Sequence, residues 1–230
     1  MKYKLSIFFI FFFVLVLSNC ISKISSNYKK EENSNNTLTL NLPNITVIDA
    51  KFPLSLTNID LNVKNSANVS DKINTEIKNT IKQYYFNECS GDSLETYFSV
   101  KDTYINTIRA YDSLYTVYWV LLKHMPEEQV NSKVLFYDNT SNEFIDNVFN
   151  FNIHALYDYN NNKLNSSNLK EHFKINTPEI KTIDYNKDGK PDFEFTRLYH
   201  NGTANAIETT ILKINDGIVD TVKFEQKQLK

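Results

Sequence analysis

The chain has few of the residues that make tight turns or disulfides, and neither sign of charge dominates it. Only 4 of its 230 residues are Gly, 2 are Cys, and the formal net charge is -2. No block rich in Lys and Arg alternates with aromatic residues, so the sequence lacks the electrostatic signature of a nucleic-acid-binding protein. We therefore expect no nucleic acid among its partners. The abundance of Asn we interpret as a coding bias.

The sequence also lacks the short motifs of several enzyme classes. It has no H-E-x-x-H, G-x-S-x-G or C-x-x-C motif and no Gly-rich phosphate loop. The four His residues stand apart, without the spacing of metal ligands. Glu127-Glu128 and the pair Glu143 and Asp146 keep a carboxylate-dependent hydrolase open as an alternative. Because acids are common on any protein surface, the absent motifs favour a non-catalytic role.

The first residues, MKYKLSIFFIFFFVLVLSNC, show the charged and then apolar order of a secretory signal. Lys2 and Lys4 precede an apolar stretch from Leu5 to Leu17 that only Ser6 interrupts. These roughly 13 residues would span about 20 Å as a helix, short of the roughly 30 Å hydrocarbon core of a bilayer. We predict that residues 1–19 are a signal peptide and not a permanent transmembrane helix.

The next feature is Leu17-Ser18-Asn19-Cys20, which resembles the lipobox of bacterial lipoproteins. In a lipobox the Cys is lipidated and becomes the first mature residue, which here implies a membrane anchor at Cys20 in the cell envelope. Asn19 departs from the Gly, Ala or Ser that is usual at this position, and ordinary cleavage after Ser18 stays open as an alternative. Residues 20–37 are polar and rich in turn formers, as expected for a flexible tether.

Cys89 is the second Cys of the chain. If Cys20 carries a lipid, Cys89 has no disulfide partner, and we interpret it as a structural or incidental thiol. No His lies near it in the sequence to suggest a Cys/His nucleophile. If Cys20 stays unlipidated in the mature protein, a disulfide between the two is possible.

The hydrophobic content of 41%, with 13% aromatic residues, is enough for a real core. We expect residues 38–230 to form a single β-rich domain of the α+β class. The segment Ser70–Phe86 places Ile73, Ile77 and Ile81 on one face and has a possible N-cap at Ser70, which predicts the main helix. A shorter helix is possible through Ser93 to Ser99, and at most a short one through 168–173.

Most other segments have the alternation or the β-branched and aromatic content of strands. Short strands are expected between Leu38 and Leu61, and antiparallel strands within 103–122, 133–138 and 144–159. Four more are expected to form a meander near the C-terminus, at 179–184, 193–199, 206–214 and 218–224. Asn201-Gly202 and Asp216-Gly217 are its hairpin signals. The predicted fold is a predominantly antiparallel, meander-like or sandwich-like sheet with one main N-terminal helix.

An Asp-rich loop, DYNKDGKPDF, separates two of these strands. Counted from Asp184, oxygen-bearing side chains stand at positions 1, 3, 5 and 9, and Gly189 stands at position 6. Ca²⁺ needs six to eight oxygen ligands, and position 7 of such loops contributes its backbone carbonyl. The pattern has a chance probability on the order of 10⁻⁴ in a chain of this composition. It predicts a structural calcium site, with a polar turn as the alternative, formed by Asp184, Asn186, Asp188, Lys190 and Asp192.

The loop DYNKDGKPD resembles the calcium loops of FG-GAP and VCBS-type segments, and more loosely those of dockerins and EF-hands. It departs from the EF-hand at position 12, where Phe195 replaces the bidentate Glu. Its flanks have period two, so a strand-loop-strand unit is expected in place of helix-loop-helix. The resemblance covers roughly residues 178 to 200 and implies a calcium site without implying an activity.

Taken together, the features favour an exported, lipid-anchored cell-envelope protein that binds another envelope protein or a glycan. One alternative is an inhibitor of a muramidase or other envelope hydrolase, for which the segment Met125–Asn131 is the candidate inserting loop. The other is an envelope hydrolase that uses carboxylates from distant strands.

Overall fold

The computed structural model describes residues 42, 45–56, 67–89, 103–124, 129–146, 148–151, 153, 155–158, 163–166, 178–200 and 205–229. The predicted signal peptide, Cys20 and the tether lie outside this part of the chain. So do the possible helices at 93–99 and 168–173, residues 125–128 and the Asn201-Gly202 turn.

The main helix forms where its apolar periodicity predicts it. Helix α2 (Asp71–Tyr84) continues into a π-helical turn, η2 (Tyr85–Cys89). Ser70 takes the N-cap position with an extended backbone, but its side chain makes no capping hydrogen bond. The buried face carries Ile77 and Ile81, both 0% exposed. The helix is therefore held mainly by the apolar face that it buries.

Nine of the described strands form the larger sheet, called sheet A here. Along it the order is β10-β9-β6-β5-β4-β1-β3, and β7 and β8 also pair with β6. Its long central strands are β4 (Tyr104–Tyr111), β5 (Tyr115–His124) and β6 (Gln129–Asp138), which are antiparallel neighbours. The others are β1 (Thr46–Ala50), β3 (Ala67–Asn68), β7 (Glu143–Phe144), β8 (Phe149–Asn150), β9 (Ala155–Asp158) and β10 (Lys163–Ser166).

Five described strands form sheet B, in the order β14-β13-β12-β11-β2. They are β2 (Leu54–Ser55), β11 (Glu179–Ile183), β12 (Asp192–His200), β13 (Asn205–Asn215) and β14 (Ile218–Gln228). All neighbours in this sheet are antiparallel. The predicted C-terminal meander is thus confirmed. Asp216 and Gly217 have φ of 47° and 77°, as a two-residue hairpin turn with both residues left-handed requires.

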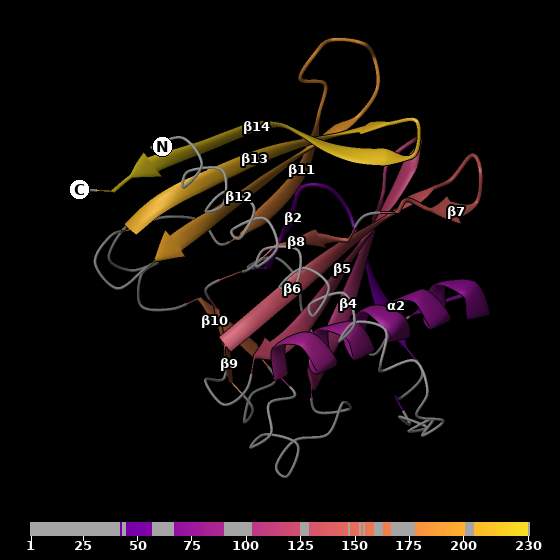
Figure 1. Ribbon diagram of the computed structural model, residues 1–230, viewed down its shortest axis with the longest axis vertical. Helices are drawn as coiled ribbons and strands as arrows, with labels where there is room; N and C mark the ends of the chain where they lie inside the picture. Colours follow the sequence, from indigo (N-terminus) through magenta and orange to yellow (C-terminus); the bar gives the residue numbers. More distant parts are fainter. Residues whose placement is uncertain are drawn as a thin grey trace, which may run out of the picture. The chain divides into compact units, whose positions relative to one another are not determined.

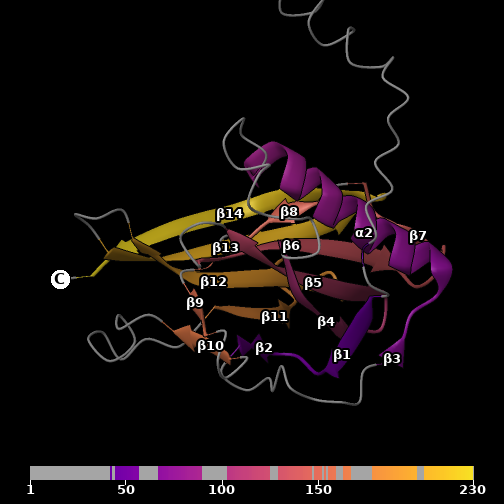
Figure 2. The same ribbon diagram turned by 90° about the horizontal axis from the view of Figure 1, so that it is seen from below.

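The two sheets pack face to face, and α2 lies against the other face of sheet A (Figures 1 and 2). The buried cluster between the sheets joins Trp119 and Phe136 of sheet A to Phe193 and Phe195 of sheet B. The Phe136 and Phe193 ring centroids are 5.0 Å apart. On the helix side, Lys133 Nζ lies 5.3 Å from the centre of the Tyr84 ring. The expected α+β class, dominated by antiparallel sheet, is confirmed.

The segment from Thr46 to Ser55 contains two of the short strands expected between Leu38 and Leu61. It divides between the sheets, since β1 belongs to sheet A and β2 to sheet B, with a cis Phe52-Pro53 bond between them. In addition, β1 pairs with β4 in parallel. The chain between β1 and β4 includes α2, and a parallel pair needs a long crossover of this kind.

Within the described residues, no helix is long and apolar enough to cross a membrane.

Candidate metal centre

The Asp-rich loop joins β11 to β12 at one end of sheet B. The strands on either side pair directly, with Ile183 opposite Asp192 and Thr182 opposite Phe193. Apolar and polar residues alternate on both sides of the loop, as in strands. The loop connects two antiparallel neighbours of the sheet. The predicted strand-loop-strand arrangement is what the structure has.

Asp184 organises the first half of the loop. Its Oδ1 accepts the backbone N–H of Asp188 at 3.0 Å, and its Oδ2 accepts that of Gly189 at 3.1 Å. Gly189 has φ of +79°, and Lys187 has φ of 62°. Residues other than Gly seldom adopt positive φ angles. Two such residues close together make a tight turn around the Asp184 carboxylate.

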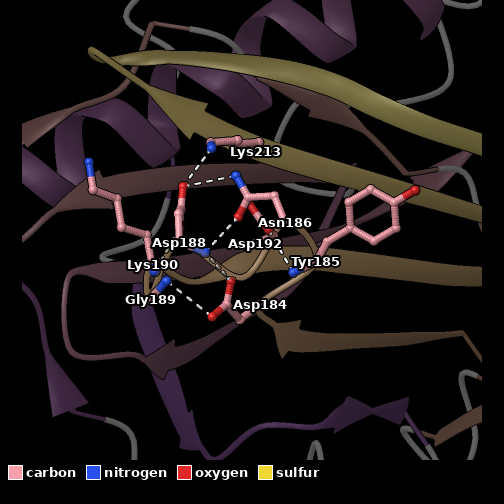
Figure 3. A network of polar contacts seen from close by, with 8 residues as sticks. All are labelled: Asp184, Tyr185, Asn186, Asp188, Gly189, Lys190, Asp192 and Lys213. Carbon is pink, nitrogen blue, oxygen red and sulfur yellow. Dashed lines mark hydrogen bonds and ion pairs between the residues drawn. The ribbon is translucent and has the colours of Figure 1, made fainter.

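Asp188 and Asn186 form the second part of the loop. The Asn186 side chain donates to Asp188 Oδ2 at 2.9 Å, and the backbone N–H of Lys190 donates to Asp188 Oδ1 at 2.8 Å. Lys213 Nζ, from β13, lies 2.6 Å from Asp188 Oδ2. Figure 3 shows the Asp188 carboxylate turned toward Lys213, whereas the Lys190 ammonium points away from the carboxylates.

Asp192 closes the loop and is 1% exposed. Its Oδ2 accepts the backbone N–H of Tyr185 at 2.9 Å, so the carboxylate is turned into the loop. Its Oδ1 is buried and has no hydrogen-bond partner among the described residues. A buried carboxylate oxygen without a donor or cation is costly, because it loses its hydration and gains nothing in exchange.

The charges around Asp188 stabilise its ionised form. The hydrogen bond from Lys213, followed by those from Asn186 and the Lys190 N–H, holds the pKa of Asp188 well below its ordinary value. Conversely, the pKa of Lys213 is raised, first by its hydrogen bond to Asp188 and further by the negative charges of Asp188, Asp192 and Asp184. The Lys213 ammonium therefore lies in the field of three carboxylates.

The loop also approaches sheet A. The Tyr115 ring of β5 lies 6.1 Å from the Phe193 ring, measured between centroids. The pKa of Tyr115 is raised, chiefly by burial and then by the charges of Asp138 and Asp188. The base of the loop is thus anchored in the core beside β5, which leaves the loop residues themselves as the exposed part.

The chain matches no protein-family model, no curated protein and no solved structure. The chemistry of the loop must therefore be inferred from its own residues.

Within the described part of the chain, no three or more His, Cys, Asp or Glu side chains form a group that could hold a metal ion. The side-chain directions account for this in the loop. The Asp188 carboxylate faces Lys213, while the Asp184 carboxylate faces backbone N–H groups. A cation that gathered these oxygens would have to displace Lys213 from Asp188.

The loop residues that the sequence singled out therefore lie in one hydrogen-bonded turn, as Figure 3 shows. The residue that sequence analysis missed is Lys213. It stands 25 positions after Asp188 and comes next to the loop because Leu212 pairs with Phe193 across β12 and β13. An isolated Lys in a strand carries no local signal of such a contact; only the strand register places it there.

The other acids considered from the sequence do not form a site that the structure describes. Glu143 makes an ion pair with Lys72 at 2.5 Å, and 66% of its side chain is exposed. Asp146 is exposed as well. Glu127-Glu128 lies outside the described residues, together with most of the candidate inserting loop, Met125–Asn131.

Proposed function

We propose that the loop from Asp184 to Asp192 binds Ca²⁺ as a structural ion. The observation that carries this proposal is Asp192 at position 9 of the loop, whose buried Oδ1 finds no hydrogen-bond partner among the residues that the structure describes. A cation would supply the partner that the oxygen lacks, and a set of carboxylate, amide and carbonyl oxygens suits a hard ion.

The ion would be held by Asp184, Asn186, Asp188 and Asp192 through their side chains, and by Lys190 through its backbone carbonyl. These residues come from both ends of the turn between β11 and β12. Three carboxylates within nine consecutive residues repel one another, so a divalent cation would stabilise the turn. The ion would keep the two strands in register and take no part in chemistry.

We place this loop in an exported, non-catalytic protein of the cell envelope that is anchored through a lipid on Cys20. The N-terminal sequence and the missing catalytic motifs support this assignment. Calcium is typically abundant outside the cytoplasm, so a dissociation constant of roughly 10⁻⁴ to 10⁻³ M would be enough to fill the site. A lipidated Cys20 in the mass spectrum of the mature N-terminus would support the anchor, and an N-terminus at Asn19 would contradict it.

The protein would act by binding an envelope protein or a glycan. Tyr111 supports this role, because the residue is 55% exposed while its hydroxyl donates to Asp49 Oδ1 at 3.1 Å. The Arg109 guanidinium lies 5.2 Å from the ring centre. Tyr and Arg are enriched at the centres of binding surfaces. Loss of co-sedimentation with isolated cell-wall glycan in Tyr111→Ala, but not in Tyr185→Ala, would support a glycan ligand. If equal amounts of the two variants sedimented with the glycan, the surface around Tyr111 would not be the glycan-binding site.

The calcium site is tested by thermal unfolding of the purified full chain in calcium and in chelator. At 100 times the dissociation constant, Ca²⁺ adds about 2.7 kcal/mol, which raises Tm by roughly 5–10 °C for a domain of this size. Asp188→Ala should lower Tm in calcium and abolish the difference between the two conditions. Asp146→Ala, which removes an exposed acid outside the loop, should keep that difference.

A further inference from the structure

The contact between Lys213 and Asp188 gives the loop a cation of its own. Lys213 stands on β13, with 17% of its side chain exposed, and its Nζ lies 2.6 Å from Asp188 Oδ2. The neighbouring residue, Leu212, is 1% exposed and fixed opposite Phe193 of β12. The base of the Lys213 side chain is therefore held by the sheet, and its ammonium group can reach the loop without ordering a long flexible segment.

Other described lysines near the loop are directed elsewhere. The Lys190 ammonium points away from the carboxylates in Figure 3. Lys223 Nζ lies 2.9 Å from Glu225 and 5.8 Å from the centre of the Tyr185 ring. Lys213 is thus the described lysine that makes an ion pair with a loop carboxylate.

Asp188 cannot keep this ion pair unchanged and also serve as a calcium ligand. Its Oδ1 accepts the Lys190 N–H, and its Oδ2 accepts both the Asn186 amide and the Lys213 ammonium. A calcium ion must bring Asp188 and Asp192 oxygens to within about 2.3 to 2.6 Å of one centre. A positive charge kept beside Asp188 would repel the ion and occupy one of the oxygens that it needs.

We propose that Lys213 is a built-in competitor of calcium, which holds Asp188 in the calcium-free loop and leaves it when the ion binds. This inference rests on the proposed calcium site. It predicts weak affinity, because calcium binding must first break an ion pair, and the free energy of that step is subtracted from the affinity.

The experiment compares calcium affinity by calorimetric titration of CaCl₂ into the purified full chain. The variants are Lys213→Gln, Lys213→Met and Lys213→Arg, and the matched control is Lys181→Gln. Lys181 makes an ion pair of similar length with Glu194, 2.7 Å, on the same sheet but outside the loop. Lys213→Met keeps much of the apolar stem and provides the same comparison if Lys213→Gln folds poorly.

Removal of the Lys213 charge should tighten calcium binding about tenfold, the change expected when a hydrogen bond between charged groups no longer has to be broken. Lys213→Arg and Lys181→Gln should bind calcium as the wild type does. A second measurement separates competition from a merely structural role. In chelator, Lys213→Gln should melt below wild type, whereas saturating calcium should remove that difference.

The outcomes distinguish this inference from the calcium proposal itself. If neither wild type nor Lys213→Gln binds calcium, the calcium site is wrong and the competitor with it. If both proteins bind calcium, and Lys213→Gln binds it no more tightly than wild type does, the calcium site stands and the competition is overturned. If the Tm of Lys213→Gln lies below that of wild type by the same amount in chelator and in calcium, Lys213 stabilises the loop without competing with calcium, and the inference is wrong.

Discussion

Asp192 Oδ2 accepts the backbone N–H of Tyr185 at 2.9 Å, and the buried Asp192 Oδ1 has no partner in the part of the chain that the structure describes. The two halves of one carboxylate thus have different roles. One oxygen ties the end of the loop to its beginning, and the other is the oxygen that the proposed calcium ion would use. The calcium proposal depends on this second oxygen.

Asp192→Asn separates these roles, because the amide oxygen can still accept the Tyr185 N–H while the negative charge is lost. In chelator we expect a Tm at least equal to that of wild type, since a buried uncompensated charge has been removed. In calcium we expect the stabilisation of about 2.7 kcal/mol to disappear. Differential scanning calorimetry in both conditions measures this. An equal loss of Tm in both would mean that Asp192 serves the Tyr185 contact alone.

Gly189 and Gly217 form a matched pair for testing the shape of the loop. Their φ values are +79° and +77°, and a Cβ at either position would meet no atom within 4 Å. Substitution by Ala at either position should therefore lower the free energy of unfolding by about 1–2 kcal/mol through backbone strain alone. We expect only Gly189→Ala to weaken calcium binding, because Gly217 lies in another turn, between β13 and β14, and contributes no residue to the loop. Urea unfolding gives the first quantity and calcium titration the second.

Should both Ala variants bind calcium as the wild type does, the left-handed conformation of Gly189 would not be needed for the site.

Ser132 joins Trp119 to Phe151 in the core between the sheets. Trp119 Nε1 donates to Ser132 Oγ at 2.9 Å, and the Ser132 hydroxyl donates to the Phe151 carbonyl. Ser132→Ala would leave a buried donor and a buried acceptor unpaired, at about 1–3 kcal/mol each. Trp119 is the single Trp of the chain, so fluorescence-detected urea unfolding reports on this site directly.

The exposed Ser113, whose hydroxyl donates to Asp112, provides the control. Ser113→Ala should change the free energy of unfolding by less than about 0.5 kcal/mol. A Ser132→Ala variant as stable as this control would show that the buried hydrogen bonds contribute little.

Asp49 and Arg109 make stability depend on pH through a bidentate contact. Arg109 Nε lies 2.7 Å from Asp49 Oδ1, and its Nη2 lies 3.0 Å from Oδ2. The hydrogen bonds from Arg109 lower the pKa of Asp49 below its ordinary value of 3.8. A group whose folded pKa is lowered stabilises the protein above its unfolded pKa, and this contribution is lost as pH falls through the folded pKa.

Asp49→Asn should therefore be less stable than wild type near pH 7 and approach it below about pH 4. Because 44% of the Asp49 side chain is exposed, we expect a difference of only about 0.5–1 kcal/mol. Urea unfolding of both proteins across this pH range measures it. A difference that did not shrink in acid would have another cause than the ion pair.

The parts of the fold that the sequence predicted are those with a strong local pattern. Helix α2 follows from Ile77 and Ile81 on one face, and the β13–β14 hairpin follows from Asp216-Gly217 between alternating segments. The parallel pairing of β1 with β4 had no such signal. Contacts between segments far apart in the sequence depend on tertiary packing, which periodicity does not encode.

The same distinction applies to the site. Asp184, Asn186, Asp188 and Asp192 lie within nine consecutive positions, so their spacing was enough to single them out. Lys213 belongs to another strand and reaches Asp188 through the register between Phe193 and Leu212. The burial of Asp192 was likewise invisible, because an Asp at the edge of a polar loop is expected to be exposed.

The most direct test of the calcium site is a titration of CaCl₂ into the wild-type full chain after extraction with chelator, followed by calorimetry. We predict a single saturable site with a dissociation constant of roughly 10⁻⁴ to 10⁻³ M, together with a higher Tm in calcium. No saturable heat, and the same Tm in calcium and in chelator, would contradict the account.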